Sequence, residues 1–208
     1  MKHWKKVTAL CLCAVCSCTF LTGCSTNAKK NQNIAEEDLP FGATMREDKS
    51  SYAIPIAYDR RFINEEQVTA VTNFFSAIQN QDADLYQAST FDYYLDYQKD
   101  KVYAVSTPEE LMQKLHESIA QSAGEDFQFR MVTFTGMATN QEAGDLHEIC
   151  TMLGSLYTGE TSFSDSLTGA WDFTVEWNIS YENDAKFLNV ADQHIFVFQT
   201  ADGYFCVI

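Results

Sequence analysis

The stretch from Trp171 to Tyr181 alternates large apolar side chains with polar ones. The apolar members are Trp171, Phe173, Val175, Trp177, Ile179 and Tyr181. Successive side chains of a strand point to opposite faces of a sheet, so this pattern predicts a strand with one buried and one solvated side. A sheet of that kind is antiparallel and needs a layer of other elements over its apolar face. We therefore expect an α+β domain in which helices cover one side of a sheet.

Residues 64–124 have the apolar spacing of helices that could form this layer. Asn64 with Gln67 three residues later is typical of a capping box at the start of a helix. Thr107 followed by Pro108 predicts the start of another, since threonine caps helices and proline is tolerated in their first turn. Between them a shorter helix is expected to run into the aromatic segment that follows. The expected helices begin near residues 64, 82 and 107.

After residue 124 the apolar period changes from helical to that of strands. We expect three strands in a meander after an isolated first strand, with one helix inserted between the first strand and the second. A loop rich in glycine, serine and threonine should follow that helix. The expected strands are 126–136, 171–181, 186–199 and 204–208, with the helix at 141–157 and the loop at 158–169.

The first 24 residues resemble the signal segment of bacterial lipoproteins. Basic residues precede an uncharged apolar run, Val7 to Phe20, which is shorter than the ~20 residues needed to cross a bilayer. The run is followed by Leu21-Thr22-Gly23-Cys24, which resembles a lipobox. The resemblance implies a diacylglyceryl group on Cys24 and cleavage before it; the alternative is an ordinary signal in which Cys24 is incidental. We expect a signal peptide at 1–23, a flexible tether at 24–51 and a domain at 52–208.

The chain carries a formal net charge of -15. An acidic surface repels nucleic-acid phosphates and anionic lipid headgroups, so nucleic acid is not an expected partner. The lipid on Cys24 would instead hold the domain on the extracytoplasmic face of the membrane, in the bacterial cell envelope.

Cys150 and Cys206 are the cysteines of the expected domain. In an exported domain they could form a disulfide, or each could be a separate buried thiol. After cleavage before Cys24 the mature chain would contain no CxxC pair. It also has no complete zincin motif and no nucleotide-binding glycine motif, so we predict no metal and no cofactor. Tight turns are expected between the last strands.

Residues 60–208 resemble the nuclear-transport-factor-2-like domains, also called cystatin-like, of exported bacterial lipoproteins. The resemblance rests on the helix motif VxxFFxAIxxxD at 71–82, the aromatic helix after it and the C-terminal strand DGYFCVI at 202–208. It implies a curved antiparallel sheet wrapped around a long helix as a cone, here with an extra helix between the first two strands. The mouth of such a cone holds a small ligand, forms a dimer interface or is filled.

Enzymes of this family, such as ketosteroid isomerases and polyketide cyclases, need an acid or base inside the cone. Strand parity turns Asp172 and Glu176 away from the helices, so we assign no catalytic residue. Arg130, Asp92 and Asp96 are other polar candidates for the interior. His194 is either a lining residue or a half-buried structural histidine. The residues expected to line a ligand or partner site are Tyr93, Tyr94, Tyr97, Trp171 and His194, although large rings also fill ordinary cores.

The sequence leaves three functions open. The first is a lipid-anchored binding domain without catalytic activity, which takes a small ligand, a peptide or an envelope protein at the cone mouth. The second is an isomerase-type or cyclase-type enzyme. The third is a structural interaction domain of an envelope assembly. A second copy of the chain, forming a homodimer, is one of the expected partners.

Overall fold

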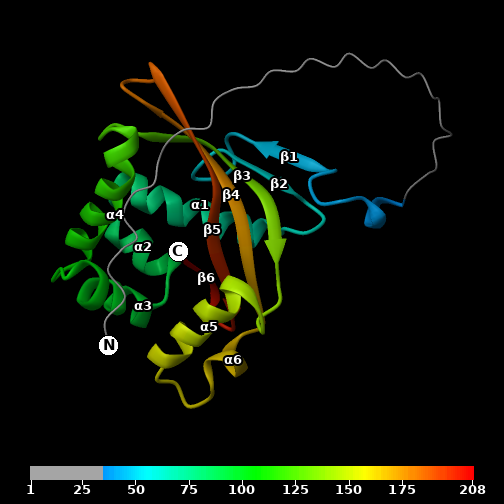
Figure 1. Cartoon of the computed structure of the whole chain (residues 1–208), viewed down its shortest axis with the longest axis vertical. Helices are drawn as coiled ribbons and strands as arrows, with labels where there is room; N and C mark the ends of the chain where they lie inside the picture. Colours follow the sequence, from blue (N-terminus) through cyan, green and yellow to red (C-terminus); the bar gives the residue numbers. More distant parts are fainter. Residues whose placement is uncertain (1–34) are drawn as a thin grey trace. The chain divides into compact units, whose positions relative to one another are not determined.

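A six-stranded sheet in the order β1-β2-β3-β4-β5-β6 forms the centre of the protein (Figure 1). The computed structural model describes residues 35–208. Neighbouring strands are antiparallel except β2 and β3, which are parallel, so the expectation of a purely antiparallel sheet is wrong at this pair. The strands are β1 (Met45–Asp48), β2 (Ile56–Asp59), β3 (Gln128–Ala138), β4 (Gly169–Tyr181), β5 (Lys186–Thr200) and β6 (Gly203–Val207).

The helices begin where their capping residues predicted. The Asn64 side chain accepts from the Gln67 backbone N–H, and the Gln67 side chain accepts from Asn64 in return. Thr107 caps the helix that starts at Pro108. The helices are α1 (Glu65–Asn80), α2 (Ala83–Ser89), α3 (Asp92–Tyr97), α4 (Pro108–Ala123), α5 (Gly144–Leu156) and α6 (Phe163–Ser166), with a π-helical turn η2 (Gln98–Tyr103) after α3 and a 3₁₀ turn η1 (Glu36–Asp38). Helix α6 lies in the segment that was expected to be a loop.

The first face of the sheet packs against α1 and α4, which lie on the same side of it in Figure 1. Phe74 and Phe75 of α1 are almost completely buried. The ring of Phe75 lies 5.4 Å from that of Phe129 in β3 and 5.4 Å from that of Trp177 in β4. Aromatic rings therefore fill the space between the long helix and the sheet.

The second face of the sheet is also covered, over the part formed by β4, β5 and β6. Phe196 and Phe198 of β5 pack there with Leu146 and Leu153 of α5. The alternation in β4 predicted that its polar side faces solvent, yet Asp172 on that side is only 7% exposed. The expectation of one wet face is wrong here because α5 lies over that end of the strand.

The expected tether at 24–51 is wrong over its C-terminal part. Strand β1 lies inside it and pairs with β2. The carboxylate of Asp59, which is fully buried, accepts from the Gly42 backbone N–H at 2.9 Å and from the Thr44 hydroxyl at 2.7 Å. Arg61 then donates to the carbonyl oxygens of Leu39 and Pro40. This polar network joins residues 39–44 to the domain and explains why a stretch poor in apolar residues is structured.

Since proline cannot donate to a strand ladder, Pro55 by itself predicts an extended edge or a loop for residues 52–62, where the structure has strand β2. It lies between β1 and β3 instead, and all of its residues are buried. Pro55 precedes the strand, where its missing N–H costs no ladder bond, and its carbonyl accepts from Val132. The expected signal peptide and Cys24 lie outside residues 35–208. Within that range, no helix is both long enough and apolar enough to cross a bilayer.

Candidate functional site

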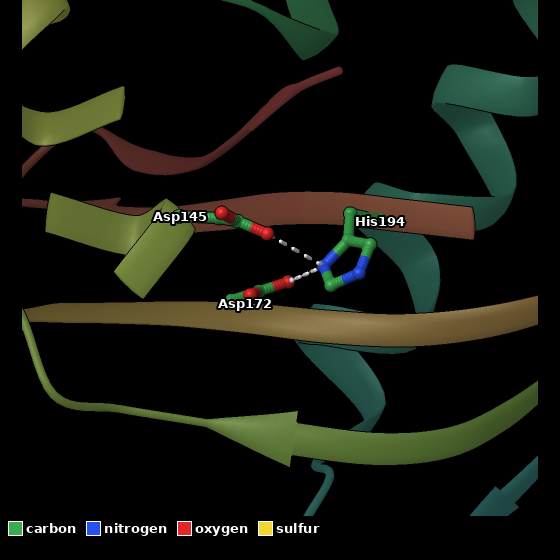
Figure 2. A group of neighbouring side chains, drawn as sticks. All are labelled: Asp145, Asp172 and His194. Atoms are coloured by element: carbon green, nitrogen blue, oxygen red, sulfur yellow. Dashed lines mark hydrogen bonds and ion pairs between the residues drawn. The ribbon is translucent and has the colours of Figure 1, made fainter. Parts of the chain in front are cut away.

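Asp145, Asp172 and His194 meet on the second face of the sheet (Figure 2). Asp145 lies in the first turn of α5, while Asp172 and His194 come from the neighbouring strands β4 and β5. Figure 2 shows both carboxylates directed at the same nitrogen of the imidazole ring. Three segments that are distant in the sequence therefore converge on one point.

A β-bulge places His194 on this face. Trp177 pairs with Val190 but Val175 pairs with Gln193, so β5 holds one residue more than β4 across this interval. Asp192 adopts a left-handed backbone there, with φ of 54°. An extra residue reverses the alternation of the strand beyond it. His194 consequently lies on the second face with Phe196, and the expectation that it lines a cone against α1 is wrong.

The distances within the group are short, and its members differ in burial. Nδ1 of His194 lies 2.7 Å from Oδ1 of Asp172 and 4.0 Å from Oδ2 of Asp145. The Asp172 side chain is 9% exposed, whereas those of His194 and Asp145 are 39% and 64% exposed. The site thus has a buried floor, formed by Asp172, and a side open to solvent.

A second feature, which we call the aromatic hollow, lies where α2, α3 and the β5–β6 turn meet. It is about 660 Å³ in volume, a size typical of small-molecule sites. Stacked rings form its wall, with Phe91 4.6 Å from Phe205 and 5.1 Å from Tyr93 between ring centroids. Its charged lining residues are Asp92, Asp165 and Asp202, and it has no basic lining residue.

The hydroxyl of Tyr93 in this wall is buried and has no hydrogen-bond partner among the described residues. Burial, with a smaller contribution from Tyr157, raises the pKa of Tyr93 well above its usual value. A buried hydroxyl without a partner costs about 1–3 kcal/mol, so proteins rarely retain one without a use. The oxygen is covered by protein, so a bound molecule would reach it only when the surrounding rings shift.

The predicted lining residues do not form one site. Tyr93 lines the aromatic hollow, but the hydroxyl of Tyr94 donates to the backbone carbonyl of Ile208, and Tyr97 stacks on Tyr94. Trp171 packs on the first face, stacked on Tyr204, and His194 belongs to the group in Figure 2. The prediction of a shared lining is wrong because Trp171 lies on the first face, whereas Tyr93 and His194 belong to separate features of the second face.

The other polar candidates are engaged at the surface. Arg130 donates to the Ser180 hydroxyl at 2.7 Å and pairs with Asp184, and Asp96 pairs with Lys99 at 3.0 Å. Sequence reasoning missed Asp145 altogether and set Asp172 aside as facing away from α1. Asp172 alternates with the apolar residues of β4, so the sequence pattern places it on the solvent side. Nothing in that pattern indicates that α5 covers this side.

Cys150 and Cys206 are free thiols on opposite faces of the sheet, so the disulfide alternative is wrong. Cys206 is completely buried in the first-face core, and burial raises its pKa. We expect a thiol reagent to modify the half-buried Cys150 faster than Cys206, which should react only after unfolding. Burial limits both access and thiolate formation, and it is complete only at Cys206. Peptide mapping of the alkylated chain measures which thiol has reacted. A peptide linked through Cys150 and Cys206 would contradict the prediction.

Comparison of the chain with protein-family models, with curated proteins and with solved structures finds no match. The functional assignment therefore rests on the residues and their geometry.

Proposed function

We propose that this protein is a binding domain without catalytic activity, anchored by a lipid on Cys24 at the extracytoplasmic face of a bacterial membrane. The α+β order of helices and sheet supports the nuclear-transport-factor-2-like assignment that we propose with it. The single observation that carries the binding role is the unpartnered Tyr93 hydroxyl in the wall of the aromatic hollow.

The lining of the hollow indicates the chemistry of the ligand. Ring faces favour flat or apolar groups, and they also attract cations. Asp92, Asp165 and Asp202 make the rim negative, with no lysine, arginine or histidine to oppose them. A small molecule or side chain with an apolar body and an amine or quaternary ammonium group fits this combination. An anionic ligand would be repelled.

The first face of the sheet supports binding over isomerase or cyclase chemistry. Such an enzyme needs an ionisable group in the apolar space beneath the long helix. The β4 residues that face α1 include Phe173, Val175 and Ile179, all fully buried among other apolar side chains. The one buried carboxylate of β4, Asp172, lies on the other face.

Native mass spectrometry of the full chain, extracted gently from its own envelope in detergent, tests the proposal. We expect a small cationic mass that is retained in the folded protein and lost on denaturation. A clean apo mass, together with no binding of amine or quaternary ammonium compounds by calorimetry, would contradict the ligand-binding role.

Replacing the Tyr93 hydroxyl should separate ligand binding from stability. Tyr93→Phe removes a buried polar group without a partner, so we expect the ligand-free protein to gain about 1 kcal/mol in chemical denaturation. Retention of the ligand should fall, because the free hydroxyl is lost. Tyr97→Phe, outside the hollow, is the matched control and should leave retention unchanged. Equal retention by the wild type and Tyr93→Phe would remove Tyr93 from the site.

A further inference from the structure

Two carboxylates gather around His194, and within residues 35–208 its imidazole is the only basic group that they contact. Asp145 and Asp172 both face its Nδ1, and no lysine or arginine among residues 35–208 pairs with either carboxylate. Asp172 is nine-tenths buried at the side chain, where an uncompensated carboxylate is costly. Nδ1 of His194 is hydrogen-bonded to Asp172 at 2.7 Å, and the three side chains together offer a mixed nitrogen and oxygen ligand set.

The spacing fits a metal ion. One ligand atom from each of the three residues lies within 4.8 Å of the others. Ligands at about 2.0–2.2 Å from an ion stand roughly 3–4 Å apart. The separations of 2.7 and 4.0 Å from Nδ1 bracket that range. Asp172 and His194 have to move apart slightly, from 2.7 Å to about 3 Å, and the exposed side chain of Asp145 is free to rotate toward the ion.

We propose that Asp145, Asp172 and His194 bind one divalent first-row transition metal, with Zn²⁺ as the best fit among the common ions. Imidazole favours zinc and its neighbours over Mg²⁺ and Ca²⁺, which prefer all-oxygen sites. His194 supplies the Nδ1 lone pair when its proton is on Nε2. The three protein ligands leave a fourth position of a tetrahedron open on the solvent side.

The ion would join the start of α5 to the middle of the sheet. Asp145 is the contribution of α5, and Asp172 and His194 are fixed on paired strands. Helix α5 also supplies Leu146 and Leu153 to the second-face core. Metal binding should consequently stabilise the cover over that face, independently of any ligand in the aromatic hollow.

Titration of the expected mature chain, which starts at Cys24 and lacks the four cysteines of the signal segment, with Co²⁺ as a spectroscopic substitute for Zn²⁺ tests the proposal. We expect visible d–d absorption that saturates at one ion per chain and is reversed by Zn²⁺, without a near-ultraviolet thiolate band. A thiolate band would place the ion at the cysteines and overturn the assignment, as would the absence of d–d absorption. The chain must carry no histidine tag.

Three variants locate the ion. His194→Gln and Asp145→Asn each remove one ligand and should weaken Co²⁺ binding by at least about tenfold. Asp145 is exposed, so Asp145→Asn keeps the test valid if a substitution at the strands impairs folding. Asp84→Asn, which changes an exposed aspartate in the first turn of α2 outside the group, is the matched control and should bind as the wild type does. Equal affinity in Asp145→Asn, His194→Gln and the control would refute the site.

Discussion

Asp59→Asn is expected to lower the free energy of unfolding by about 3–5 kcal/mol, the usual cost of breaking a buried ion pair from one side. Asp59 is fully buried, and both of its oxygens are paired with Arg61, Nε to Oδ1 at 3.1 Å and Nη2 to Oδ2 at 2.7 Å. An asparagine amide would place N–H groups against the Gly42 and Arg61 donors. The remaining guanidinium would lose its partner. Chemical denaturation of the full chain measures the loss.

The same variant should alter the response to acid. The hydrogen bonds from Arg61, together with those from Thr44 and Gly42, hold the pKa of Asp59 well below its usual value. The unfolded chain therefore binds a proton more readily than the folded one, so this stabilisation is complete above about pH 4 and declines as the pH falls further. In Asp59→Asn this part of the decrease in the free energy of unfolding at low pH should be absent.

The exposed Asp38 provides the matched control. Asp38→Asn should change stability by no more than about 0.5 kcal/mol. In Asp59→Asn, limited proteolysis should also cleave residues 39–44 faster, since the network that holds them is broken. If both variants unfold alike, the Asp59 network does not anchor this segment.

Phe198→Ala is expected to cost about 3–5 kcal/mol of stability, as for other large-to-small changes at buried aromatic residues. Phe198 has no exposed surface, and its ring lies 5.7 Å from that of Phe163 and 5.9 Å from that of Phe91. Truncation would leave a cavity between β5 and the cover of the second face. Chemical denaturation again measures the effect.

Phe187 lies on the same strand and is 65% exposed. Phe187→Ala should therefore change stability by no more than about 0.5 kcal/mol, which makes it the control for strand propensity. A similar small effect in Phe198→Ala would mean that α5 and α6 do not cover the second face in solution. That result would also remove the buried floor from the group around His194.

Most of the helices and strands after residue 64 could be predicted because their signals are local. Asn64 and Gln67 fix the start of α1 through a capping box, and Gly124 ends α4 with φ of 83°, a backbone conformation that glycine adopts without strain. The alternation of Phe173, Val175 and Ile179 correctly predicted which side of β4 faces α1. Such patterns depend only on neighbours a few residues away.

The positions of the functional residues depended on tertiary structure instead. A single extra residue near Asp192 reverses the parity of β5 and moves His194 to the second face. Helix α5 then covers Asp172 and brings Asp145 to the same imidazole, although no motif spacing links the three. Likewise, Asp59 and Arg61 recruit a polar segment that has no apolar period of its own. The sequence by itself determined the capped helices α1 and α4, the strands β3 to β6 and the apolar face of β4. Strands β1 and β2, the bulge in β5 and the cover that α5 gives to the second face were decided only by long-range packing.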